Sequence, residues 1–134
     1  MTKGVVVGIN GNMVTAEVTE GRPVQNEVAY VQCGDERLKA EVIRIQGDVC
    51  NIQVFEDTKG INVGMEIDFT GELLSTNLGP GMLGMIYDGL QNPLKLLKNR
   101  QDFFLMRGQY APALDPERKW TFHPTASVGD TVLK

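Results

Sequence analysis

Turn signals at short, regular intervals constrain the fold of this chain more than any other sequence feature. The first is Asn10-Gly11, a pair typical of tight β-hairpins. Further combinations of Gly with Asp, Glu or Pro lie at 20–23, 34–36 and 47–48, and another turn begins at Gly60. The fifteen Gly and six Pro of the chain point to many turns, which favours an all-β class over a helical one.

The apolar residues between these turns follow a strand pattern. Val14, Ala16 and Val18 alternate with polar residues, as expected of a strand with one buried face. Six strands are predicted, at residues 5–9, 13–19, 27–32, 37–46, 49–55 and within 60–69. Six short antiparallel strands predict a small closed barrel, because closure removes the exposed edges of an open sheet.

A Gly-Pro-Gly sequence follows the predicted barrel. Proline fixes its own φ, and glycine adopts φ values that other residues avoid. Gly79, Pro80 and Gly81 are therefore predicted to form a hinge where the chain leaves the barrel. Proline also removes a backbone donor, and no Lys with a hydroxyl residue follows, so this is not a phosphate-binding loop.

A short helix is predicted after the hinge. One apolar face would be formed at helical spacing by Leu83, Ile86, Tyr87 and Leu90. Asp88 and Gly89 lie within this stretch, where Gly89 weakens the helix, and Pro93 ends it. A second helix of one or two turns is predicted from Leu94, with Asn92 as its cap and Pro93 at its first position.

Composition and charge exclude several functions. The net charge is −4, and no Lys/Arg cluster is interleaved with aromatics, so no nucleic-acid partner is expected. No apolar run could cross a bilayer and no signal segment is visible, so we expect a cytoplasmic protein without direct membrane contact. Cys33 and Cys50 lie in apolar runs without metal-ligand spacing, and both are predicted to be buried and free.

No catalytic, cofactor-binding or metal-ligating residue is predicted within the chain. The only histidine, His123, lies beside a proline without a nearby nucleophile in sequence. The acidic pairs Asp35-Glu36 and Glu56-Asp57 are interpreted as solvated turns. Trp120 and Phe122, two residues apart, are expected to share one face and contribute to a small core.

The stretch from Leu78 to Leu94 reads LGPGMLGMIYDGLQNPL. It resembles the segment that joins the barrel to the nucleotide-binding domain in the catalytic A subunit of V/A-type rotary ATPases, whose pattern is close to LGPGLLGxIYDGIQRPL. The chain departs from that pattern at Met82, Leu90 and Asn92. The hinge and structural residues carried over from this resemblance are Gly79, Pro80, Gly81, Tyr87, Asp88, Gly89 and Pro93.

Other parts resemble the same family. Residues 41–45 (EVIRI) and 52–61 (IQVFEDTKGI) are similar to two of its barrel strands. Residues 108–124 resemble the start of the insertion called the bulge domain, and the VGDTV sequence at 128–132 is similar to a turn that continues it. The implied domains are a crown barrel at 1–71, a hinge and helix at 72–99, and a truncated bulge at 100–134.

The resemblance implies a parent enzyme that couples ATP synthesis or hydrolysis to proton or sodium transport, with Mg-ATP as its cofactor. It also implies B subunits alternating with A subunits in a hexameric ring, a peripheral stalk contacted by the bulge, and a place at the periphery of the membrane. The fragment itself would be an inactive scaffold, since a phosphate loop is missing.

Two alternatives remain open at this point. One is a free-standing small barrel that binds a protein or a nucleic acid, and the other is a ring subunit of the related flagellar or secretion ATPases. A further expectation concerns residues 100–134, whose aromatic residues would lack the rest of the bulge. We expect this segment to associate with a second copy rather than to dock on its own barrel.

Overall fold

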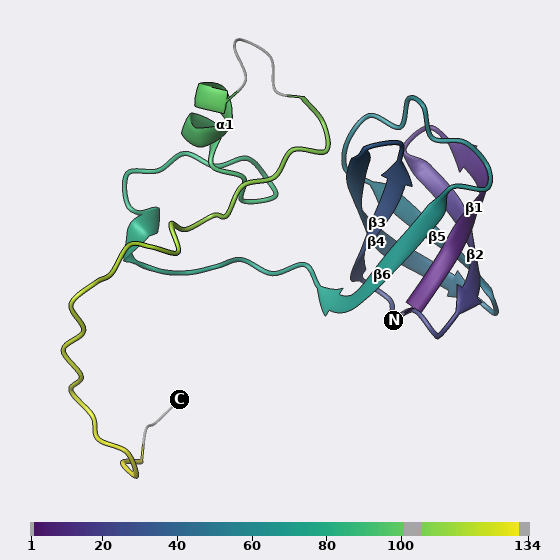
Figure 1. The fold of residues 1–134 in the computed structure, drawn as a ribbon. Coiled ribbons are helices and arrows are strands. Elements are labelled where there is room, and N and C mark those ends of the chain that lie inside the picture. Colours follow the sequence, from purple (N-terminus) through teal and green to yellow (C-terminus); the bar gives the residue numbers. More distant parts are fainter. Residues whose placement is uncertain (1, 101–105, 132–134) are drawn as a thin grey trace.

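The computed structural model describes residues 2–100 and 106–131 (Figure 1). Most of the first half is strand, as predicted, and short helical segments follow. The strands are β1 (Thr2–Asn10), β2 (Met13–Glu20), β3 (Glu27–Cys33), β4 (Glu36–Gln46), β5 (Val49–Val54) and β6 (Glu66–Leu73). The helical segments are the 3-10 turn η1 (Pro80–Met82) and the helix α1 (Leu94–Arg100).

The six strands form a closed antiparallel barrel in the order β1-β2-β5-β4-β3-β6. Pairing of β1 with β6, for example Thr2 with Phe69, closes the circle. The predicted fold class, mainly β with a six-stranded barrel, is therefore confirmed. The first turn lies one residue later than expected, since Gly11 and Asn12 connect the last pair, Asn10 with Met13.

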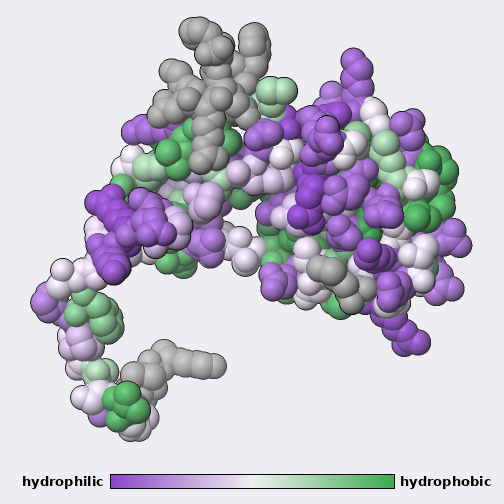
Figure 2. All heavy atoms as spheres, viewed as in Figure 1, coloured by the Kyte–Doolittle hydropathy of each residue, from purple (hydrophilic) through white to green (hydrophobic). Residues whose placement is uncertain are grey.

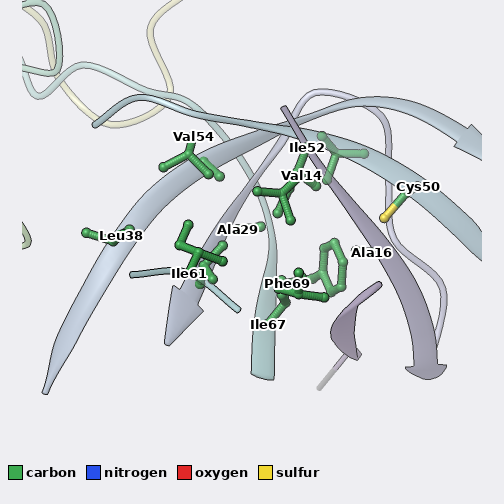
Figure 3. Packing of buried hydrophobic residues seen from close by; sticks show 14 of the residues in the cluster. Val14, Ala16, Ala29, Leu38, Cys50, Ile52, Val54, Ile61, Ile67 and Phe69 are labelled. Carbon is green, nitrogen blue, oxygen red and sulfur yellow. The ribbon is translucent and has the colours of Figure 1, made fainter. Parts of the chain in front are cut away.

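The alternation in the sequence sets the inside of the barrel. Val14 and Ala16 are fully buried, and Val18 packs against the same cluster, as the pattern predicted. Figure 3 shows Val14 of β2 and Ile67 and Phe69 of β6 in the barrel interior, and Leu38 of β4 belongs to the same cluster. All fifteen residues of the cluster come from positions 6–69, so the barrel has a core of its own.

Gly4 marks a place where the barrel wall is too tight for a side chain. A Cβ at this position would lie 2.7 Å from the Glu17 carbonyl oxygen on β2 and 3.1 Å from the Phe69 ring. The register between β1 and β2 also shifts beside Gly4. The glycine therefore allows the backbone of β1 to lie close to the Phe69 ring and to β2.

Both cysteines are buried and free, as predicted. Burial raises the pKa of Cys50 from its ordinary value of 9.0 to about 11, and the Glu27 carboxylate adds to this effect. Because the folded state holds this proton more tightly, its stabilising effect is complete below pH 9 and is lost as pH rises toward 11.

We therefore expect the free energy of unfolding to fall by about 3 kcal/mol between roughly pH 9 and 11 because of Cys50 alone. Urea unfolding of the wild type and of Cys50→Ala across this range measures the effect. The variant should start lower, because it loses packing, but should show the shallower decline. Parallel declines in the two proteins would contradict the prediction.

The stretch after the hinge is not the predicted helix over 83–90. Leu83 follows the 3-10 turn with extended φ and ψ, and Gly84 has φ +77°. Residues 86–94 instead form a tight loop with a bridge between Tyr87 and Pro93. The helical spacing was misleading, since the Asp88 side chain binds backbone N–H groups that a helix would use internally.

The short helix predicted from Leu94 is present as α1, with Leu97 buried. Pro93 was expected at the first helical position, so the helix begins one residue later than that, at Leu94. The Pro93 carbonyl accepts from the N–H groups of Leu96 and Leu97, so Pro93 occupies the cap position that was assigned to Asn92. No backbone N–H is lost there, because the first helical donors have no partner inside a helix.

Residues 106–131 contain no strand or helix, and only the last, yellow part of this segment runs away from the other described residues (Figures 1 and 2). Trp120 is 46% exposed and Phe122 is 83% exposed, so the small core predicted from this pair is wrong for the chain as described. Phe103 and Phe104, which belong to the separate expectation that residues 100–134 self-associate, lie outside the described residues.

The beginning of this segment docks on its own barrel. Arg107, Gly108 and Tyr110 hydrogen-bond to β4 and to the loop after β5. The expectation that residues 100–134 pair with a second copy rather than dock is thus wrong for 107–110. For the exposed residues beyond Trp120, self-association stays a prediction.

Candidate functional site

The connection that leaves the barrel is the candidate functional site. It starts at a buried carboxylate, Glu27, which is 1% exposed at the beginning of β3. One oxygen accepts from the Val24 N–H at 2.6 Å, and the other accepts from the Gly71 N–H. Glu27 therefore ties the loop before β3 to the end of strand β6, and so fixes the point where the chain leaves the barrel.

The Gly-Pro-Gly sequence is a packing site more than a flexible joint. Gly79 has φ 178°, an extended value open to any residue, and Pro80 opens the 3-10 turn η1. A Cβ on Gly79 would lie 3.1 Å from the Leu114 side chain, and one on Gly81 would lie 3.4 Å from it. Gly79 therefore makes room for the returning segment, whereas a Cβ on Gly81 would make only ordinary contact with it. The role of both glycines as a hinge stays a prediction.

Asp88 organises the loop that follows. Its Oδ1 accepts from the Leu90 N–H at 2.9 Å and from the Asn92 N–H at 2.7 Å. Its Oδ2 accepts from the Asn92 side-chain amide at 2.9 Å. Backbone bonds from Asp88 to Asn92 and from Leu94 to Ile86 close the loop around this carboxylate. Gly89, next to Asp88, has open space where a Cβ would be.

Replacing Asp88 by Ala should open this loop without unfolding the barrel. Three acceptor contacts to a charged group are lost, each contributing about 1.5–3 kcal/mol in such a setting. We expect hydrogen exchange at Leu90 and Asn92 to accelerate at least about tenfold. Two-dimensional NMR measures this, with Asp115→Ala as the matched control. Unchanged exchange at both amides would contradict the role of Asp88.

Two further contacts hold the loop in place. The Tyr87 hydroxyl donates to the Ala113 carbonyl oxygen at 2.9 Å. The Gln91 side chain binds Asn77 in both directions, accepting from its N–H at 2.8 Å and donating to its carbonyl at 2.7 Å. Tyr87 was among the predicted residues, whereas Gln91 was not. Its positive φ of 63° gives no signal in the sequence, since glutamine is not typical of that conformation.

The acidic pairs are not merely solvated turns. Glu36 lies 2.8 Å from Arg107, and the Glu56 carboxylate accepts from the Gly108 N–H at 3.0 Å. The hydrogen bond with Glu36 raises the pKa of Arg107 further above its ordinary value. The solvated interpretation is therefore wrong for Glu36 and Glu56. The partners are 71 and 52 positions apart, so no local pattern could indicate them.

Tyr110 completes this contact. Its hydroxyl accepts from the Lys39 N–H at 2.9 Å and donates to Glu56 at 3.3 Å, and its ring meets Tyr30 edge to face. Burial, followed by the nearby Glu56 charge, raises the pKa of Tyr110. The phenol therefore stays neutral, and keeps its donor to Glu56, up to a higher pH than an ordinary tyrosine.

An open groove of about 520 Å³ lies between the hinge, α1 and residues 112–120. Its lining is mainly apolar, and Leu96 and Trp120 belong to it. Leu78, Leu83 and Ile86, elsewhere on the connection, are more than half exposed. Among residues 2–100 and 106–131, no group of three His, Cys, Asp or Glu side chains could hold a metal ion. In the same residues, no helix is long and apolar enough to span a membrane.

The barrel matches a known protein family. Residues 6–71, the closed barrel, match the model of the ATP synthase alpha/beta family, beta-barrel domain. The barrel, residues 6–71, belongs to the ATP synthase alpha/beta family. The matched segment begins inside β1 and ends inside β6, so it coincides with the barrel and its core.

Several curated relatives match this chain far beyond the barrel. The V-type ATP synthase alpha chain of Treponema denticola is 56% identical over 133 residues, 99% of this chain and 22% of the relative. V-type ATP synthase alpha chain 1 of Treponema pallidum is 53% identical over the same shares. The Borreliella afzelii alpha chain is 54% identical over 98% of this chain and 23% of the relative. The chain thus spans less than a quarter of their length.

The match covers the connection and the segment after it as well as the barrel. The alternative of a free-standing barrel module is not favoured, because the similarity continues through the connection and the segment after it. The resemblance to the V/A-type family is confirmed. The seven hinge residues carried over from it remain predictions as functional residues, although the structure gives contacts for several of them.

Proposed function

We propose that this chain forms the barrel and the first connection of a V-type ATP synthase alpha subunit, the catalytic A subunit of the complex. One observation carries the proposal. A closed six-stranded barrel of the ATP synthase alpha/beta family is followed by a connection, and both match V-type alpha chains at 53–56% identity. The proposed activity of the parent is ATP synthesis or hydrolysis coupled to proton or sodium transport.

In this proposal the barrel is a scaffold. Barrels of alternating A and B subunits would form a ring, and the ring would hold the nucleotide-binding domains at fixed positions. Mg-ATP would be the cofactor of the parent enzyme and would bind outside residues 1–134, because this sequence has no phosphate loop. The complex would lie in the cytoplasm at the periphery of the membrane.

The proposed domains follow from the same reasoning. Residues 1–71 would be the crown barrel, 72–99 the hinge and helix leading to the nucleotide-binding domain, and 100–134 the start of the bulge that faces the peripheral stalk. The exposed apolar side chains of Leu78, Leu83 and Ile86 support this division. In a longer subunit such side chains would be covered by the domain that follows.

The structure suggests how the connection would serve this scaffold. Glu27 fixes the exit point on the barrel, and Asp88 closes the loop beyond the hinge. Each is a carboxylate that satisfies two or more backbone N–H groups. A connection held in this way transmits the orientation of the barrel to the chain that follows.

The test has two arms, both made with the whole chain. In the first, the chain is mixed with the beta chain of the same V-type ATP synthase, and binding is measured by analytical ultracentrifugation. We expect a heteromeric complex. The control is the Val14→Asp variant, which should lose it because the barrel no longer folds. A folded wild-type chain that leaves the beta chain unbound would count against the proposed ring.

In the second arm, calorimetric titration with Mg-ATP should show no saturable site with micromolar affinity, and no phosphate should be released. A micromolar site would mean that the chain itself binds nucleotide. That result would contradict the scaffold role even if the beta chain bound.

A further inference from the structure

Arg107 lies in a set of acceptors that matches all of its donors. Its Nε and Nη2 both lie 2.8 Å from Glu36 Oε2. Nη1 donates to the backbone carbonyls of Asp57, at 2.8 Å, and Lys59, and Nη2 lies 3.9 Å from Cys33 Sγ. A guanidinium has five N–H donors in a planar fork, and each has an acceptor on the barrel. A lysine ammonium, with three donors, could not fill the same set.

The barrel holds these acceptors in place by contacts of its own. Glu36 begins β4 directly after the two-residue turn from β3. In the loop after β5, the Asp57 side chain accepts from the Lys59 N–H at 3.0 Å. The Thr58 hydroxyl donates to the Gly11 carbonyl at 2.7 Å, and the Thr58 carbonyl accepts from the Ile61 N–H at 3.0 Å. The acceptor set is therefore organised independently of Arg107.

A second set of contacts lies beside the first. Glu56 binds the Gly108 N–H and the Tyr110 hydroxyl, and the Lys39 N–H binds the same hydroxyl. Gly108 has φ +69°, and a Cβ there would lie 3.1 Å from the Glu36 side chain. These contacts fit a peptide in which an arginine is followed by a glycine, with a tyrosine two positions after the glycine.

We propose that this surface of the barrel is a binding site for an Arg-Gly-x-Tyr peptide turn, and that residues 107–110 occupy it as a releasable latch. Arg107, Gly108 and Tyr110 each form hydrogen bonds between this later segment and residues 2–73. When the latch opens, the later segment is joined to the barrel through the connection after Leu73, and the barrel stays folded. This inference does not depend on the proposed function.

The first test measures hydrogen exchange in the whole chain by NMR. Arg107→Lys keeps the charge but not the fork, and Arg118→Lys is the matched control on a residue that stacks on Trp120. We expect exchange at Gly108 and Lys39 to accelerate about tenfold or more in Arg107→Lys, with Ile52 in the core unchanged. Unchanged exchange at Gly108 and Lys39 would overturn the proposal. So would equal acceleration at Ile52, because the contact would then be part of barrel folding.

The second test offers the ligand from outside. The acceptor is the whole chain with Arg107→Ala and Tyr110→Ala, and the probe is a capped peptide with the sequence of residues 106–113. We expect saturable NMR shifts at Lys59 and Gly60, with an affinity of about millimolar, since weak sites of this kind normally benefit from covalent connection. A peptide with Lys in place of Arg should bind at least about tenfold more weakly.

Adding Glu36→Gln to the acceptor should likewise remove the preference for arginine over lysine. The proposal is overturned if the two peptides bind equally to the acceptor with Glu36 intact. It is also overturned if the arginine peptide gives no saturable shift while the core resonances show a folded barrel.

Discussion

Replacing Val14 by Asp is expected to unfold the barrel at room temperature. Val14 has no exposed surface and packs among the core residues contributed by the strands of the barrel. An unpaired carboxylate there costs several kcal/mol, on the order of the whole 5–15 kcal/mol that stabilises a domain. Circular dichroism during urea and thermal unfolding measures the loss.

The control for Val14→Asp is Thr19→Asp, which adds the same charge at an exposed position of the same strand. This variant should unfold close to the wild type. If Val14→Asp melted within about a degree or two of the wild type, Val14 would not point inward, and the register of β2 would have to change.

The second large effect is expected for Glu27→Gln. Both oxygens of Glu27 accept backbone N–H groups, and a glutamine has one acceptor oxygen and one amide that would face a donor. A buried donor without a partner costs about 1–3 kcal/mol, and a charge-assisted bond is lost as well. We expect destabilisation by about 3 kcal/mol in urea unfolding.

Glu27→Gln has a second readout that a packing defect would not produce. The negative charge of Glu27 contributes to the raised pKa of Cys50, so its removal should lower that pKa. The Cβ chemical shift of Cys50 during a pH titration measures the change. Glu20→Gln, at an exposed end of β2, is the control for losing one negative charge. Unchanged stability together with an unchanged Cys50 titration would refute the role of Glu27.

The barrel could be predicted because its information is local. Alternation around Val14 gave the inward face, and the turn signals gave the strand ends to within a few residues. The error over 83–90 has a physical cause, since apolar residues at helical spacing were outweighed by one carboxylate at Asp88 and by the positive φ of Gly84. Periodicity describes apolar faces and does not register competition for backbone donors.

The latch could not be predicted from a single sequence. Arg107 meets Glu36 across 71 positions, and half of its acceptors are backbone carbonyls, which have no sequence signature. The structure also places Leu114 close to Gly79, a contact that the sequence around the glycine does not indicate. These contacts depend on where the returning segment lies, and that is decided by tertiary structure.

The closure of β1 on β6 has a mechanical consequence. The chain enters the barrel at Thr2 and leaves it at Leu73, and the pairing of Thr2 with Phe69 puts both ends at the same end of the barrel. A force that pulls Leu73 outward would load the antiparallel ladder one pair at a time, in the way a zipper opens. The pairing of Leu73 with Glu27 on β3 and the Glu27 carboxylate on Gly71 both lie before the first pair with β1, so the start of β3 would bear that load first. The resistance of the barrel to tension from its own connection would then depend on how firmly β3 holds the end of β6, through strand pairing, the Glu27 side chain and the bond from Thr70 to the Val28 carbonyl.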